Sequence, residues 1–207
     1  MPKMQHICYQ QGMMQANPGE IIHKDKKFEN ITYENKHLIG RVFRNCTFSK
    51  SSMKGCKFED SSFDGCTFDD CDISLMKFQD TAFTNITVNN CKAMGIAWSE
   101  ATNPFSIQFL HSRISYSVFY GKNLRKTKIV YCQADEADFS ECNLSQADFG
   151  YTDLRGARFS NTDLTKANFA GAKNYYIDPA ANKIAKAKFS LPEALSFLQV
   201  LDIELVD

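Results

Sequence analysis

Apolar residues recur every five positions over most of the chain, and this period is the main pattern in the sequence. Every fifth residue from Phe28 to Trp98 is apolar, and the same step resumes one residue out of phase and runs from Phe109 to Phe169. Fourteen of the 17 phenylalanines lie on these two ladders. A step of five spreads apolar residues around an α-helix and alternates between the two faces of a regular strand. Neither regular element therefore explains the pattern.

A second set of positions, two residues before the ladder residues, carries mostly small side chains. Examples are Cys46, Ser51, Cys66, Ala137 and Thr152. The repeating unit is thus small-x-large-x-x. It fits a solenoid in which each repeat forms one short extended side and one corner, with the small and large residues pointing inward and the other three outward. Successive coils would then stack as parallel strands about 4.8 Å apart.

The repeats ADFSE, CNLSQ, ADFGY and TDLRG resemble those of the pentapeptide-repeat proteins. The resemblance covers about residues 26–172. It implies an all-β solenoid, a right-handed quadrilateral β-helix with four repeats in each coil.

Interruptions of the repeat predict the organisation of the chain. We expect a polar N-terminal arm or cap (1–27), a first repeat segment (28–98), a break (99–108), a second repeat segment (109–173) and a C-terminal helix with a dimerisation tail (174–207). The break holds eleven residues of spacing between Trp98 and Phe109, where two repeats need ten. The extra residue, with Pro104 near it, is expected to bulge out of the rod.

The C-terminal segment carries the signals of a short helix. Ser190 and Glu193 form a capping box with a proline between them, and an apolar stripe at helical spacing follows. We expect this helix to cap the last coil and its remaining apolar surface to contact a second copy. The candidate dimer residues are Leu191, Leu195, Leu198, Leu201, Ile203 and Leu205.

Charge is balanced over the whole chain but not locally. The chain has 24 basic and 24 acidic residues, which argues against a protein held to nucleic acid by overall charge. Residues 110–133 hold only basic charges, whereas residues 55–80 and 134–163 are mainly acidic. These acidic residues avoid the inward positions, so we expect stripes on the surface. The candidates for partner binding are Glu59, Asp60, Asp64, Asp69, Asp70, Asp72, Asp80, Asp135, Glu136, Asp138, Glu141 and Asp148.

The sequence gives little support to catalysis, a metal or a cofactor. Seven of the eight cysteines occupy the inward small position, and no C-x-x-C pair exists. We expect these seven to be buried, reduced thiols and not zinc ligands, with Cys8 outside the set. The four histidines are scattered. No apolar run is long enough for a membrane span or signal peptide, so a cytoplasmic protein without enzymatic activity is expected.

Within the pentapeptide-repeat family, the chain resembles the gyrase-protecting group, which includes the Qnr proteins and the albicidin-immunity protein. The shared features are the size, Trp98 followed by a proline-containing break, and the stretches SVFYGKNLRKTKIVYCQADEADF and NYYIDP. The resemblance implies a DNA mimic that binds DNA gyrase, extends to topoisomerase IV, counters an antibiotic or toxin poison, and dimerises through its C-terminus.

Two further features bear on this functional expectation. The break is expected to contact the partner through Glu100, Thr102, Asn103, Pro104 and Phe105. The basic residues Arg113, Lys122, Arg125, Lys126 and Lys128 interrupt the acidic surface, which departs from DNA mimicry over the full length. The alternative function is a pentapeptide-repeat scaffold or secreted effector that binds another protein.

Overall fold

Each five-residue repeat folds as a short extended side followed by a corner. In β5 (Thr47–Ser49), the Phe48 ring is buried and the flanking residues are half-buried on the outside. The residue after the strand, Lys50, has φ 47° and turns the chain. Similar left-handed residues follow at steps of five, and many are Asn, Asp or Gly, the residues that tolerate this region best. The small-x-large-x-x pattern thereby sets both the side and the corner.

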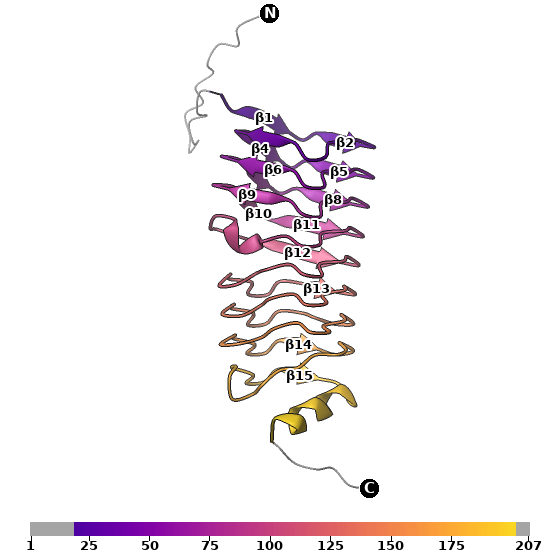
Figure 1. The fold of residues 1–207 in the computed structure, drawn as a ribbon, viewed down its shortest axis with the longest axis vertical. Helices are drawn as coiled ribbons and strands as arrows, with labels where there is room; N and C mark the ends of the chain where they lie inside the picture. The colour runs from indigo at the N-terminus through magenta and orange to yellow at the C-terminus, as the bar shows by residue number, and fades with distance from the viewer. Residues whose placement is uncertain (1–18, 202–207) are drawn as a thin grey trace, which may run out of the picture.

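The computed structural model describes residues 19–201, which wind into a rod of about eight turns with four sides (Figure 1). The β4 side is a parallel sheet of β1 (Ile21–Lys24), β4 (Arg41–Arg44), β7 (Ser62–Asp64) and β10 (Ala82–Thr84). The β5 side contains β2 (Lys27–Glu29), β5, β8 (Thr67–Asp69), β11 (Ile86–Asn89), β12 (Ile107–Leu110) and β13 (Ile129–Val130), and β14 (Asn168–Phe169) pairs with β15 (Lys188–Phe189).

The other two sides have less regular strand structure. The β6 side contains β3 (His37–Ile39), β6 (Lys57–Glu59) and β9 (Lys77–Gln79). The fourth, the bridge side, is held by isolated parallel bridges that run from Thr32 through Asp72 to Lys173. Within residues 19–201, no helix is both long and apolar enough to span a bilayer. The all-β solenoid expected from the repeats is confirmed.

Coils stack in a register of twenty residues, which places like residues above one another. Phe48 pairs with Phe68 across β5 and β8, and their rings stack with centroids 4.9 Å apart. The whole second ladder from Phe109 to Phe169 is buried. On the first ladder the core begins only at Leu38, since Tyr33 is exposed and Phe28 is half-buried at the end of the described rod.

The register changes once, at the predicted break. Ala82 still pairs with Thr102, twenty residues later, but Val88 pairs with Phe109, twenty-one residues later. The 3₁₀ helix η1 (Trp98–Glu100) opens this segment. The extra residue is therefore absorbed between Thr102 and Phe109, and the twenty-residue register resumes in the next coil, where Phe109 pairs with Ile129.

The C-terminal helix differs from the expectation in type and in orientation. It is a nine-residue 3₁₀ helix, η2 (Glu193–Leu201), and not an α-helix. The Ser190 hydroxyl accepts a hydrogen bond from the Gly171 amide (3.0 Å) in the preceding coil, so it ties η2 to the rod. Phe197, outside the predicted stripe, packs edge-on against Phe189 with ring centroids 4.7 Å apart.

The predicted leucine stripe therefore does not cover the last coil. Leu191 and Leu195 are exposed, and Leu198 is half-buried. Leu191 precedes η2. Because a 3₁₀ helix has three residues per turn, Leu195 and Leu198 share one face of η2, whereas Phe197, which packs against Phe189, lies on another. The side chain of Leu201 and all of Ile203 and Leu205 lie outside the described residues.

Candidate partner-binding surface

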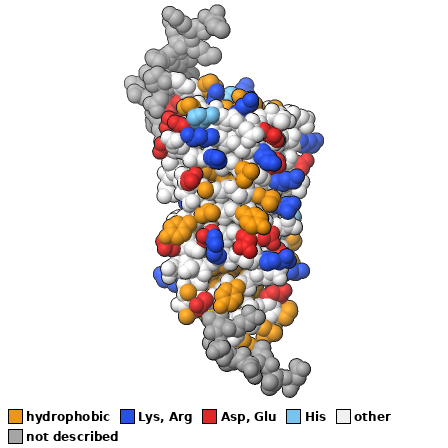
Figure 2. All heavy atoms as spheres, in the orientation of Figure 1, with side chains coloured by type: hydrophobic (Ala, Val, Ile, Leu, Met, Phe, Trp, Pro, Cys, Tyr) orange, Lys and Arg blue, Asp and Glu red, His pale blue; other side chains and the backbone are white. Residues whose placement is uncertain are grey.

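The predicted acidic residues point outward but do not form one stripe. Asp69, Asp70 and Asp148 lie on the β5 side, and Asp72, Asp135 and Glu136 lie on the bridge side. Figure 2 shows acidic and basic side chains interspersed over one face of the rod. A twenty-residue coil distributes a block of sequence over all four sides, so a charged block in the sequence does not become a patch on the surface.

Many of these carboxylates are engaged in hydrogen bonds within the rod. Asp69 accepts a hydrogen bond from Asn89 (2.7 Å), its partner across β8 and β11. Asp72 and Asp148 accept from the amides two residues later, Ser74 (3.0 Å) and Gly150 (3.0 Å). Such bonds are typical of Asx turns, and they assign these aspartates a structural role.

Other members of the set are paired in the same way. Asp64 accepts from Thr84 (2.7 Å) and Asp135 accepts from Ser115 (2.9 Å). Asp138 accepts from the Ser140 amide (2.9 Å) and pairs with Arg158 at 3.3 Å.

Glu59 sits between two basic side chains on the β6 side. Lys57 and His37 each lie 2.8 Å from its carboxylate. Hydrogen bonds from Lys57 and then from His37 hold the pKa of Glu59 below its ordinary value. Glu59 is thus a compensated charge and a weak source of attraction for a partner.

A smaller group of predicted carboxylates is exposed at one corner of the rod. Asp60 follows β6, Asp80 follows β9, and Glu100 ends η1, so the three occupy equivalent corners of successive coils. Glu141 occupies the same corner two coils later, after Gly121. In residues 19–201, Asp60, Asp80 and Glu100 form no hydrogen bond or ion pair through their carboxylates. We call Asp60, Asp80, Glu100 and Glu141 the acidic corner.

The break adjoins this corner in the coil of Glu100. Asn103 and Pro104 are exposed and Thr102 is half-buried, so the expected bulge exists. Phe105 is only 7% exposed and packs beside Trp98, with ring centroids 6.0 Å apart. The structure therefore corrects the prediction for Phe105, which belongs to the core and not to the contact surface. An aromatic ring that enters the core compensates for the irregular backbone of the bulge.

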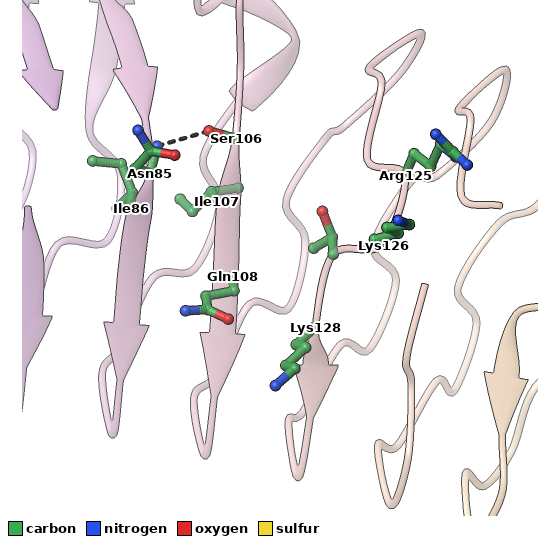
Figure 3. Close-up of a pocket in the computed structure, with 9 residues that line it drawn as sticks. Asn85, Ile86, Ser106, Ile107, Gln108, Arg125, Lys126 and Lys128 are labelled. Carbon is green, nitrogen blue, oxygen red and sulfur yellow. Dashed lines mark hydrogen bonds between the residues drawn. The ribbon is translucent and has the colours of Figure 1, made fainter. Parts of the chain in front are cut away.

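Three of the basic residues, Arg125, Lys126 and Lys128, border a hollow on the other edge of the β4 side (Figure 3). The hollow has a volume of about 310 Å³. β12 pairs with β11 along its full length but with β13 only at Phe109 and Leu110, so the wall opens here. The lining consists of Asn85, Ile86, Ser106, Ile107, Gln108, Arg125, Lys126, Thr127 and Lys128.

Two features were not predicted, an aromatic stack on the surface and a buried lysine. His111, Tyr131 and Tyr151 stack at one corner of successive coils, with ring centroids 5.0 and 4.9 Å apart. Their common position two residues after a ladder residue is visible in the sequence and could have identified them. Lys122 is buried, whereas Arg113, Arg125, Lys126 and Lys128 are exposed.

The seven described cysteines are free and buried, as expected from the inward positions. Among residues 19–201, no group of three or more His, Cys, Asp or Glu side chains is arranged to hold a metal ion. Cys8 lies outside the described residues.

Comparisons with known proteins identify the repeat and the fold. Two sequence families, both described as pentapeptide repeats, match residues 142–173 and 37–76. Among curated proteins, no sequence matches the chain. The structure of a trypsin-treated variant of QnrB1, a plasmid-mediated fluoroquinolone resistance protein, is 18% identical with a TM-score of 0.50, and the match covers 89% of this chain and 99% of that one.

Further solved structures share the likeness at lower similarity. Full-length QnrB1 is 18% identical with a TM-score of 0.43, covering 88% of this chain and 100% of that one. HetL, a pentapeptide repeat protein involved in heterocyst differentiation regulation in the cyanobacterium Nostoc sp. strain PCC 7120, is 11% identical with a TM-score of 0.40, covering 84% and 86%.

Proposed function

We propose that the chain, whose repeats match those of pentapeptide-repeat families and whose fold is like that of QnrB1, is a non-enzymatic binding protein for DNA gyrase. Bound to this type II topoisomerase, and to topoisomerase IV, it would protect the enzyme from an antibiotic or toxin poison. The likeness to QnrB1, a fluoroquinolone resistance protein, supports this class of function. The proposal places the function on the outer surface of the rod.

The observation that carries the proposal is the acidic corner beside the break. Its carboxylates repeat along the axis at the coil spacing of about 4.8 Å, and a duplex carries one phosphate per 3.4 Å along each strand. Asp60, Asp80 and Glu100 are exposed and without a basic partner among the described residues. Complementary charge accelerates association with a basic DNA groove. Mimicry is thus proposed for one corner of the rod and not for its whole surface.

Neutralising this corner tests the proposal. We expect Asp60→Asn/Asp80→Asn/Glu100→Gln to weaken binding to purified gyrase about tenfold at low salt and to flatten its salt dependence. Protection in a supercoiling assay with a fluoroquinolone should fall in parallel. Asparagine tolerates the left-handed backbone of Asp60 and Asp80, so the fold should be preserved.

The matched control removes the same charge from other parts of the rod. Glu29→Gln/Asp70→Asn/Glu136→Gln neutralises three exposed carboxylates away from the acidic corner, and it should bind gyrase as the unmodified protein does. Equal loss in both variants would mean that only net charge matters. If the unmodified protein does not bind either topoisomerase, the alternative function, a scaffold for another protein, replaces this one.

A further inference from the structure

Lys122 occupies an inward position that elsewhere holds small or apolar residues. It is 5% exposed and is the one charged side chain that is buried between residues 19 and 201. Its neighbours in the same column of the rod are Ala101 in the preceding coil and Cys142 in the following coil. Burial lowers the pKa of Lys122, and in the described chain no carboxylate lies within ion-pair distance of it. A buried charge without a counter-ion is costly, so its contacts require an explanation.

The coil-to-coil hydrogen bonding on the β4 side is interrupted where Lys122 lies. In regular coils the carbonyl of the inward small residue accepts from an amide in the next coil, as Ser61 does from Ala82 (3.0 Å) and Thr81 from Thr102 (2.9 Å). Among the described residues, no amide of the next coil donates to the Ala101 carbonyl. The bridges stop at Thr102 and resume only between Asn123 and Asn143.

The ammonium group of Lys122 takes the place of the missing amide. Lys122 Nζ donates a hydrogen bond to the Ala101 carbonyl oxygen, the acceptor that the interruption leaves without an amide partner. The same ammonium lies over the Phe105 ring, 5.3 Å from its centroid, a cation–π geometry. One side chain therefore contacts Ala101 and Phe105, the residues that flank the segment Thr102–Pro104.

From this geometry we infer that Lys122 is the positioning residue of the break, whose ammonium fixes where Thr102, Asn103 and Pro104 stand on the surface. This inference rests on the proposed function only for its consequence, that gyrase protection needs the segment in this position. The core packing of the rod itself does not require a charge in the Lys122 position, since other coils place Thr81, Cys142 or Thr162 there.

The test replaces the charge but keeps the length of the side chain. In Lys122→Met, we expect hydrogen exchange of the amides of Thr102, Asn103, Phe105 and Ser106 to accelerate about tenfold, equivalent to about 1.4 kcal/mol. Emission of Trp98, the single tryptophan, should shift because its neighbour Phe105 loses its cationic contact. Urea unfolding should show little change in global stability, since removal of a buried charge offsets the loss of the hydrogen bond to the Ala101 carbonyl.

A second variant and a control complete the design. Lys122→Ser introduces a residue type found in this column at Ser61 and should give the same local acceleration, which keeps the test open if the methionine variant does not fold. Lys126→Met removes an exposed charge four residues after Lys122. It should leave the amide exchange of the break and the Trp98 emission unchanged. Unchanged exchange in both Lys122 variants would overturn the inference, because the side chain would then only fill space.

Gyrase assays on the same variants separate the inference from the proposed function. Faster exchange together with retained gyrase binding and lost protection supports both. Faster exchange in a protein that never bound or protected gyrase leaves Lys122 as the positioning residue of the break and rejects the proposed function. Lost protection with unchanged exchange contradicts the inference and leaves the proposed function standing.

Discussion

At the scale of the residue, the inward small side chains satisfy backbone carbonyls as well as fill space. Thr81 Oγ1 donates to the Phe58 carbonyl (3.1 Å), Cys142 Sγ donates to the Phe119 carbonyl (3.1 Å), and Ser112 Oγ donates to the Val88 carbonyl (3.3 Å). Each acceptor lies in the preceding coil. A thiol and a hydroxyl in this position thus make the same hydrogen bond to a backbone carbonyl, which explains why Cys, Ser and Thr share it. The large number of cysteines therefore needs no metal site to explain it.

Burial of these thiols predicts a loss of stability at alkaline pH. It raises the pKa of Cys66, Cys132 and Cys142 from 9.0 to about 12. Between pH 9 and 12 the folded protein keeps three protons that the unfolded chain releases. The contribution of these thiols to the free energy of unfolding is thus fully present below pH 9. Above pH 9 it falls by about 1.4 kcal/mol per pH unit for each thiol, or about 4 kcal/mol per pH unit for three.

Urea unfolding at pH 8, 9 and 10 under reducing conditions measures this slope. The control is Cys66→Ala/Cys132→Ala/Cys142→Ala, which removes the three titrating groups and should show a much shallower decline. Parallel declines in the two proteins would assign the alkaline loss to other groups and contradict the burial of these thiols.

At the scale of the element, one strand separates inward from outward positions. In β8, Phe68 is buried between Phe48 and Val88, its partners in the two adjacent coils, whereas Asp69 points outward. We expect Phe68→Ala to lower the free energy of unfolding by about 3–5 kcal/mol through lost burial and a cavity. Asp69→Asn keeps an oxygen that can accept from Asn89 and should change it by less than about 0.5 kcal/mol. Chemical denaturation of both variants would contradict the assignment if the losses were equal.

The five-residue spacing predicted a solenoid, and the resemblance to pentapeptide-repeat proteins supplied the four repeats in each coil, which stack Phe48 on Phe68 in the core. The sequence could not predict which way Phe105 turns, because an inserted residue breaks the spacing on which the assignment depends. The repeat places Lys122 at the inward position two residues before Leu124. It could not show how the ammonium is satisfied there, since its acceptor, the Ala101 carbonyl, belongs to the interrupted backbone of another coil. The structural role of Asp72 and Asp148 could have been predicted, because each stands two residues before the amide from which it accepts a hydrogen bond.

At the scale of the whole molecule, both ends of the described rod carry apolar residues. An apolar hollow of about 270 Å³ opens at the N-terminal end of the described core, lined in part by Phe28, Tyr33 and Leu38. At the other end, η2 covers the last coil with Phe197 and exposes Leu191 and Leu195. Figure 1 places η2 at the C-terminal end of the rod, so an end-to-end contact between two copies through η2 would lengthen the rod.

The last prediction concerns this end-to-end dimer. Leu191 is 76% exposed and Leu195 is 49% exposed, so Leu191→Glu/Leu195→Glu should leave the rod folded. If a second copy covers these leucines, burying two carboxylates there is unfavourable, and light scattering at micromolar concentration should show a dimer in the unmodified protein and a monomer in the variant. Leu75→Glu is the control, because Leu75 is 50% exposed on the side of the rod, and it should remain dimeric. A monomeric unmodified protein would contradict the dimer. Gyrase binding should survive in the double variant, because the acidic corner lies within one copy.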